Sequence, residues 1–586
     1  MLFQELARVY EQVEARSSRL EMTDILAGFF RTVDCASLPK VIYLTQGQLY
    51  PDFYPNKLGL ADRLLLRTMV MASGVREEQI QEIWLKEGDP GIVAQKVFQT
   101  KKQRTLFSEP LTLDRVYDGL VRITEEEGGG SQDLKMKLLA KLLSDATAEE
   151  AKFISRIVTG KMRLGVAAMT VVDALAVAFA TKEDRDAVER AFNISSDLGK
   201  VAQVICSQGI QAVREMKVQV GSPMRAMLAE RLPSPKEILE KLGGRAAFEY
   251  KYDGVRVQAH ITKKGITLYS RRLEDLTGQF PDVAKALGKA FKGESAIVEG
   301  ECVPVDLNTG ELLPFQEVSH RRGRKHGLED AIEDYPVKVF LFDCAFKEGE
   351  DLTSKPYLER RRSLEESFER TDEVRFSEMR VLGDEEAVEA FFQEALRDGC
   401  EGLMAKSVED NSVYRAGSRG FLWIKYKKEY RSEMTDTVDL VVVGAFAGRG
   451  KRAGVYGALL MATYNEKEDT FETVCKLGSG FDDETLAKLP PLLESYKLSA
   501  PHPRVVSKMV PDYWFEPSMV LEVLGAEITI SPIHTTAMSK IRPGAGLAIR
   551  FPRFTGRIRD DKRAREATTS AELEAMYRRQ LKTIGG

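Results

Sequence analysis

Long apolar runs are absent from this sequence, which argues against a membrane-spanning segment. A span needs about 18 or more consecutive apolar residues, and Thr170 and Asp173 interrupt the longest run, residues 166–180. The first twenty residues are charged from position 5 onward and contain no signal-peptide core. We therefore expect a cytoplasmic protein in which residues 166–180 form a buried helix.

Cysteine is scarce and is not arranged for metal binding. No C-x-x-C pair occurs, and no cysteine has a histidine at the spacing of zinc ligands. Structural zinc is therefore not expected, and a cytosolic chain of this size is not expected to contain disulfides. The prediction is buried free thiols at all six positions, which are Cys35, Cys206, Cys302, Cys344, Cys400 and Cys475.

An excess of positive charge is also missing. The 85 lysines and arginines stand against 89 aspartates and glutamates, for a net charge of −4. A simple nucleic-acid-binding module is expected to be basic, so the total counts mildly against one. A large enzyme can still carry basic stripes on an acidic body, and 586 residues are enough for about three domains.

The first 215 residues are predicted to be helical. Leucines fall on one helical face between residues 134 and 143, and Thr147 with Glu150 forms a capping-box pattern. The Gly-rich segment 125–131 predicts a loop between two helices.

After residue 215 strands and helices alternate. The patterns predict strands at 246–252, 255–262 and 266–270, the last two joined by a turn at 263–265, and further strands at 296–303 and 337–345. From about residue 433, short strands at 438–445, 455–464 and 471–476 predict a small β-barrel, with an exposed basic loop at Gly448–Lys451 and a final helix at 570–582. The expected fold is thus an all-α domain, an α+β domain and a β-barrel domain.

The most specific local feature is the string Glu249-Tyr250-Lys251-Tyr252-Asp253-Gly254-Val255-Arg256 at a strand end and turn. A lysine amine attacks phosphorus only when it is unprotonated, and nearby positive charge such as that of Arg256 favours the neutral form. A string this short recurs by chance, and a solvated strand followed by a D-G turn is the structural alternative.

Further charged and aromatic strings follow the lysine in a defined order. Each could be an ordinary core or surface feature, but their joint occurrence is hard to obtain by chance. They are Ser270-Arg271-Arg272, Glu299-Gly300-Glu301, Phe342-Asp343, the strand from Glu401 to Lys406, and Trp423-Ile424-Lys425-Tyr426-Lys427-Lys428.

This ordered set resembles the covalent nucleotidyltransferases, which include DNA ligases, RNA ligases and messenger-RNA capping enzymes. Residues 156–175, 550–562 and 567–582 are more specifically similar to the archaeal and eukaryotic replicative type of ATP-dependent DNA ligase. The resemblance implies a helical DNA-binding domain at 1–215, a nucleotidyltransferase domain at 216–432 and an OB-fold domain with a C-terminal helix at 433–586. It also implies nick sealing through a lysine–AMP intermediate, with ATP as co-substrate and Mg²⁺ as cofactor.

The family's residue roles can be carried over to matching positions. Lys251 would carry AMP, Glu249 would accept a hydrogen bond from the adenine amino group, and Phe342 would stack on adenine. Glu301 and Glu401 would hold Mg²⁺, which prefers hard oxygen ligands. The cations implied to contact ribose, phosphates or pyrophosphate are Arg256, Arg271, Lys406, Arg419, Lys425, Lys427 and Lys562.

Nicked duplex DNA and a sliding clamp are the expected partners of a monomeric enzyme. Lys161, Arg163 and the Gly448–Lys451 loop are candidates for DNA phosphate contacts. The segment Gln103–Phe107 resembles the clamp-binding peptide of archaeal ligases, with Leu106 and Phe107 as apolar anchors. Packing of these two side chains into their own domain is the alternative.

Three other functions stay open at this point. An RNA ligase or a GTP-dependent capping enzyme would share the nucleotidyltransferase motifs, although a capping enzyme does not need some 215 helical residues ahead of the lysine. A non-catalytic DNA-binding scaffold would be expected to have lost the motif lysine or the acids, and none is lost here. NAD is not expected as the AMP donor. Ligases that use NAD resemble a different layout with a zinc-binding cysteine cluster, which this chain lacks.

Overall fold

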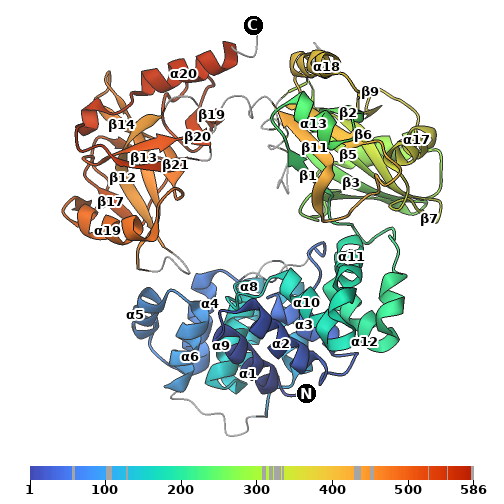
Figure 1. The fold of residues 1–586 in the computed structure, drawn as a ribbon. Helices are drawn as coiled ribbons and strands as arrows, with labels where there is room; N and C mark the ends of the chain where they lie inside the picture. Colours follow the sequence, from blue (N-terminus) through green and yellow to red (C-terminus); the bar gives the residue numbers. More distant parts are fainter. Residues whose placement is uncertain are drawn as a thin grey trace. The chain divides into compact units, whose positions relative to one another are not determined.

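A computed structural model describes residues 1–55, 58, 60–100, 109–126, 128, 130–305, 312, 313, 315, 318, 321, 332, 335–427, 437–448, 454–525, 527–550 and 552–582. The chain divides into two compact units, Met1–Tyr426 and Lys427–Gly586. Figure 1 labels their helices and strands. Among the described residues, no helix combines the length and the apolar character that crossing a membrane requires.

The N-terminal part of the first unit is helical, as predicted. Its helices share one hydrophobic core that runs from Phe3 to Val213. They are α1 (Phe3–Glu14), α2 (Arg19–Phe30), α3 (Leu38–Thr45), α4 (Asp62–Ser73), α5 (Glu77–Glu87), α6 (Pro90–Gln99), α7 (Leu113–Glu125), α8 (Ser131–Asp145), α9 (Ala148–Val158), α10 (Ala168–Phe179), α11 (Arg185–Ser195) and α12 (Leu198–Arg214).

Local sequence signals explain several of these helix ends. The predicted capping box is confirmed: the Thr147 hydroxyl accepts a hydrogen bond from the Glu150 amide, and the Glu150 carboxylate accepts one from the Thr147 amide. The apolar run predicted to be a buried helix becomes α10, and the Gly-rich break separates α7 from α8.

One prediction about the cysteines is wrong. Cys35 and Cys206 form a disulfide, with their Cα atoms 5.5 Å apart, within the usual range for such a bond. The two lie 171 residues apart in sequence, and they meet because α12 packs on α3, the helix that follows Cys35. The other four cysteines are buried free thiols, as predicted.

The second part of the first unit contains two β-sheets with helices on their outer faces (Figure 1). The smaller sheet has the order β1 (Leu228–Arg231), β11 (Arg419–Lys427), β10 (Gly402–Ser407), β2 (Ala246–Lys251) and β9 (Met379–Leu382), and α13 (Pro235–Lys241) and α18 (Glu385–Arg397) pack beside it. The larger has the order β4 (Gly265–Ser270), β3 (Val255–Thr262), β5 (Ala296–Pro304), β6 (Val337–Lys347) and β7 (Glu350–Asp351), with β8 (Val374–Phe376) beside β6. The helices α14 (Pro281–Ala290) and α17 (Tyr357–Ser367) cover this larger sheet.

Alternation along the strands gives each sheet an apolar outer face and a polar inner face. On β2, Phe248 and Tyr250 join the core formed with α13 and α18, so Glu249 and Lys251 point the other way. On β3 and β5, Val257 and Val298 enter the core of the larger sheet, which leaves the charged residues of those strands on the opposite face.

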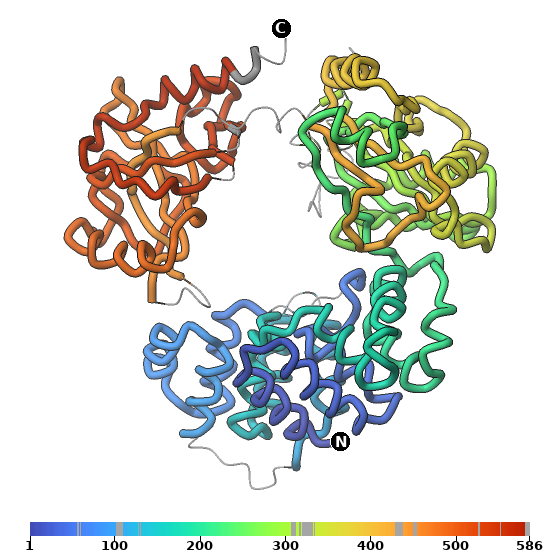
Figure 2. Tube along the Cα trace, viewed as in Figure 1, coloured from blue at the N-terminus to red at the C-terminus, as the bar shows by residue number. Residues whose placement is uncertain are grey.

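The second unit, whose trace is coloured orange to red in Figure 2, is strand-rich and OB-like. Its main sheet has the order β15 (Lys497–Leu498), β17 (Tyr513–Phe515), β12 (Val438–Ala447), β13 (Tyr456–Asn465), β14 (Thr470–Leu477) and β16 (Val505–Val506). Strand β18 (Val520–Leu524) pairs with β12 and with β21 (Arg553–Ile558), and β19 (Glu527–Ser531) pairs with β20 (Gly546–Arg550). The helices α19 (Asp483–Glu494) and α20 (Ser570–Lys582) contribute to the same core.

Candidate active site

Lys251 is the last residue of β2, and its side chain is about three-quarters buried. Its Nζ forms an ion pair with the carboxylate of Glu401, the residue just before β10. The pairing follows from the sheet, because Gly402 is the antiparallel partner of Lys251. A lysine and an acid predicted from strings 150 residues apart therefore meet at one strand end.

The turn after Lys251 explains the glycine of the motif. A Cβ atom on Gly254 would lie 2.3 Å from the backbone oxygen of Cys302 and 3.1 Å from Cγ of Glu301. Only a residue without a side chain therefore lets the turn approach β5 this closely. Asp253 accepts a hydrogen bond from the amide of Phe315 at 3.1 Å, so part of its role is to hold the turn.

Glu301 and Arg256 face each other across β5 and β3, where they are register partners. Burial raises the pKa of Glu301 to about 7, and the Glu401 and Asp253 carboxylates add to the rise, while Lys251 and Arg256 oppose it. Lys251, Arg256, Glu301 and Glu401 thus act on one another at one place, as the motif order implied.

Arg256 is held by a second acid. Its Nη2 donates to Glu299 at 2.7 Å, and Glu299 also accepts hydrogen bonds from the Tyr414 hydroxyl at 2.9 Å and from Gln258 at 3.3 Å. Burial by itself would lower the pKa of Arg256, but the Glu299 carboxylate outweighs it and the pKa is raised. Arg256 is therefore a fixed cation on the inner face of β3.

Glu249 and Lys406 form a buried ion pair, with their side chains 3% and 1% exposed and 2.8 Å between Nζ and Oε2. The Lys406 ammonium lies over three aromatic rings, 4.9 Å from the centroid of Phe342, 4.5 Å from that of Tyr357 and 4.6 Å from that of Trp423. Since Lys406 and Phe342 come from different sheets, these contacts bring the two inner faces together. Burial lowers the pKa of Lys406, although Glu249 opposes the shift.

Helix α17 places further polar and charged residues beside these side chains, and the sequence patterns did not single them out. The Tyr357 hydroxyl donates to Glu249, and Arg361 lies 3.5 Å from the same carboxylate. Arg360 is fully buried and ion-pairs with Asp343 at 2.8 Å. The sequence of α17 carries three consecutive arginines, Arg360 to Arg362, and is typical of an exposed helix. Its one usable signal is the apolar spacing of Tyr357 and Leu364, which places the first two arginines on the buried side.

The remaining predicted cations on or near β4 and β11 are more exposed. Arg271 lies in the turn after β4, and Arg419 begins β11, and both are exposed. Lys425 and Lys427 are half-buried on β11. Strand alternation places them on the same face as Trp423, whose ring contacts Lys406.

Other predicted positions lie elsewhere. Lys562 belongs to the second unit, where its Nζ forms an ion pair with Asp439 at 2.7 Å. Lys161 pairs with Asp62 at 3.6 Å and Arg163 with Asp89 at 3.3 Å. The segment Gln103–Phe107 lies outside the described residues, and so do residues 449–451 of the predicted basic loop.

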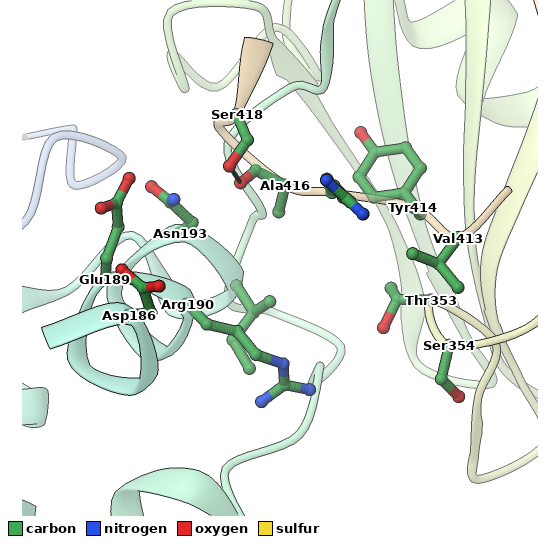
Figure 3. A pocket seen from close by; sticks show the side chains of 12 residues that line it. Asp186, Glu189, Arg190, Asn193, Thr353, Ser354, Val413, Tyr414, Ala416 and Ser418 are labelled. Atoms are coloured by element: carbon green, nitrogen blue, oxygen red, sulfur yellow. Dashed lines mark hydrogen bonds between the residues drawn. The ribbon is translucent and has the colours of Figure 1, made fainter. Parts of the chain in front are cut away.

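A cavity of about 570 Å³ opens between α11 and the segments 353–354 and 413–418 (Figure 3). None of Lys251, Glu301 and Lys406 lines this cavity. The cavity is therefore separate from the charged residues between the sheets. Tyr414 belongs to both surroundings, because it lines this cavity while its hydroxyl bonds to Glu299.

Known families cover most of the chain. The ATP dependent DNA ligase domain matches residues 226–427, the DNA ligase N terminus residues 2–176 and the ATP dependent DNA ligase C terminal region residues 452–562. DNA ligase 2 of Thermofilum pendens is 51% identical over 587 residues, which cover 99% of this chain and 97% of that relative. The chain belongs to the ATP-dependent DNA ligases.

Further comparisons agree with this family. The DNA ligase of Caldivirga maquilingensis is 49% identical, covering 99% of this chain and 98% of the relative. That of Staphylothermus marinus is 47% identical over the whole of both chains. A solved structure titled Pmar-Lig_PreS3 covers 94% of this chain and 99% of its own with a TM-score of 0.54, and at 15% identity it supports the multidomain fold alone.

The family defines the reaction of this ligase, which seals nicks in duplex DNA with ATP. An enzyme lysine attacks the α-phosphate of ATP and releases pyrophosphate. AMP then moves to the 5′-phosphate of the nick, and the 3′-hydroxyl displaces AMP to close the strand. The prediction of a DNA ligase is thereby confirmed over an RNA ligase, a capping enzyme or a scaffold.

Proposed function

We propose that Lys251 is the lysine that carries AMP in this ligase. The supporting observation is the meeting of Lys251 with Glu401, Glu301 and Arg256 where β2, β3 and β5 come together. Phosphoryl transfer depends mainly on positioning and charge neutralisation, and this group supplies one nucleophile, one fixed cation and two acids. The ion pair with Glu401 orients the Lys251 amine.

Glu301 and Glu401 are proposed to hold Mg²⁺. Their oxygens are the ligand type that Mg²⁺ prefers, and Mg²⁺ is commonly bound by one or two carboxylates together with substrate phosphates. Among the described residues no group of three or more potential ligands is placed to hold a metal ion, so substrate phosphates and water would have to complete the coordination. A bound Mg²⁺ would neutralise phosphate charge and compete with Lys251 for Glu401, which favours the neutral amine.

The nucleotide contacts follow from the residues around Lys251. Phe342 would stack on the adenine, and Glu249 would lie at its edge. Arg256 would meet the ribose or a phosphate, as would Arg271 and Arg419 from exposed positions. Lys425 and Lys427 would hold the triphosphate. Lys406 is too deeply buried to lie freely among the phosphates, so its charge would act from beneath the bound nucleotide. Lys562 would orient the pyrophosphate in the first step.

We further propose the roles of the whole chain. Residues 1–215 would bind DNA, 216–432 would carry out adenylation and 433–586 would form the OB-fold domain, in a monomeric enzyme. Gln103–Phe107 would bind a sliding clamp through Leu106 and Phe107, supported by the likeness of this segment to clamp-binding peptides. Loss of clamp binding in Phe107→Ala, with ligation normal in the absence of the clamp, would support this role.

The decisive test is transfer of labelled AMP to the protein. Full-length ligase is incubated with α-labelled ATP and Mg²⁺, run on a denaturing gel, and chased with nicked DNA. Lys251→Ala should lose all labelling while keeping its Tm, and Lys236→Ala, an exposed lysine on α13, should label normally. Labelling of Lys251→Ala would overturn the assignment.

A further inference from the structure

Three donors surround the Glu249 carboxylate on the inner face of β2. Lys406 binds its Oε2 at 2.8 Å, and the Tyr357 hydroxyl and Arg361 both address its Oε1. Two of these three donors come from α17. The carboxylate is therefore fixed from one side by a helix that takes no other part in the reaction proposed above.

Arg361 is itself held in place by two further contacts. Its Nε donates to Glu365 at 2.7 Å and its Nη2 to the backbone oxygen of Ser377 at 2.8 Å. Its Nη1 has no hydrogen-bond partner among the described residues and lies 3.5 Å from Oε1 of Glu249. A buried guanidinium with a spare N–H aimed at a carboxylate is costly for folding alone, which points to a use at the site.

We propose that Arg361 is a positioning residue for nucleotide recognition: with Tyr357, it holds the Glu249 carboxylate against Lys406 and so fixes the charged floor on which the adenine of ATP rests. The inference relies on the proposed stacking of adenine on Phe342. It follows from the contact of Lys406 with the Phe342 ring, because any movement of the Glu249–Lys406 pair changes the surface beneath that ring.

The charges around Glu249 support this role. Burial raises the pKa of Glu249, Asp343 on β6 adds to the rise, and Lys406 on β10 and Arg361 on α17 oppose it. Removing the Arg361 charge would raise this pKa further. As the pH falls, the carboxylate of the variant would then become protonated at a higher pH than in the parent ligase, and Lys406 would lose its partner.

The test compares four variants of the full-length ligase in the labelling assay. Arg361→Met removes the charge, Arg361→Lys retains it, and Tyr357→Phe removes only the hydroxyl. Arg362→Met changes the neighbouring exposed arginine on the same helix and serves as the control. For each variant, KM for ATP, kcat of self-adenylation and Tm are measured between pH 6 and 9.

Arg361→Met should raise KM for ATP roughly tenfold or more, the usual cost of losing a charged contact, with kcat within about threefold of the parent value. The rise should be larger at pH 6 than at pH 8. Arg361→Lys should recover part of the loss, Tyr357→Phe should show a smaller rise in KM, and Arg362→Met should show none.

An unchanged KM in a folded Arg361→Met protein would overturn the inference, as would an equal loss in Arg362→Met. If Arg361→Met fails to fold, Tyr357→Phe decides, since it removes only the hydroxyl that donates to the same carboxylate. Lys251→Ala in the same assay separates the two hypotheses. Labelling of Lys251→Ala contradicts the proposed function. If Lys251→Ala is not labelled and Arg361→Met has a normal KM, only the role of Arg361 is contradicted.

Discussion

Two buried arginine–carboxylate clusters in the first unit differ in a way that separates structure from function. In the helical part, Arg156 is 1% exposed and donates to Glu14 at 2.8 and 3.0 Å and to Asp89 at 2.9 and 3.2 Å. Burial would raise the pKa of both acids, but the hydrogen bonds from Arg156 outweigh it and lower both. This cluster is electrostatically complete.

The cluster between the two sheets is the opposite. The pKa of Glu249 and that of Glu301 are raised, chiefly by burial, and that of Lys406 is lowered by burial. Burial therefore disfavours the charged forms of Glu249, Glu301 and Lys406 in the protein without a ligand. Perturbed groups of this kind gather at functional sites, whereas satisfied clusters contribute to folding. The comparison thus supports the proposed placement of the site at the sheet cluster by an argument that does not use sequence motifs.

The largest expected effect tests the complete cluster. Arg156→Met removes the cation that Glu14 and Asp89 share and leaves them only Lys152 and Arg163, so the free energy of unfolding of the helical part should fall by about 3–5 kcal/mol. Chemical denaturation followed by circular dichroism measures it. Arg67→Met, an exposed position on α4, should have little effect. A small loss in Arg156→Met would mean that the two clusters do not differ as described.

Glu301→Gln, in the cluster between the two sheets, should lower activity and raise stability. Self-adenylation should fall roughly 10²–10³-fold, the usual cost of removing one charge-stabilising group. Stability without divalent metal should rise. The folded-state pKa of about 7 lies above the ordinary value, so the parent protein loses stability as the pH rises through 7, and glutamine removes that loss. Tm at pH 8 measures it, with exposed Glu294→Gln as the control. A lower Tm in Glu301→Gln would contradict the interpretation.

Reduction of the Cys35–Cys206 disulfide probes the helical part without touching either cluster. Closing a loop of 171 residues should stabilise the fold by about 2–4 kcal/mol. Tm should therefore fall on addition of reductant, while labelling of Lys251 by ATP stays normal. Cys35→Ser should have a lower Tm than the parent ligase even without reductant, and its Tm should not change when reductant is added. A response in that variant would show that another group is reduced.

The smallest change in stability is expected from Lys562→Ala in the second unit. Its ion pair with Asp439 is partly exposed, so the loss should be below about 1 kcal/mol. The proposed role predicts that adenylation of Lys251 suffers far more than sealing of pre-adenylated nicks, and the two rates are measured separately. Lys467→Ala, on an exposed turn, is the control. Equal losses in both steps would indicate a structural role.

The strands that local patterns predicted lie within a few residues of observed strands. Strand β3 and helix α20 have the predicted bounds, and the turn at 263–265 joins β3 to β4. Periodicity of this kind arises from backbone geometry over a few residues, which is why sequence reveals it. The same alternation places Glu249 and Lys251 on one face of β2, away from Phe248 and Tyr250.

The sequence by itself determined the family, the ordered motifs and the strand that carries Lys251. Only the tertiary structure decided that Cys35 bonds to Cys206, that Lys406 is enclosed by three aromatic rings, and that Arg360 and Arg361 of α17 are buried beside Asp343 and Glu249. These contacts join residues far apart in the chain. Their existence depends on how whole sheets and helices pack, and no short-range pattern in the sequence records that packing.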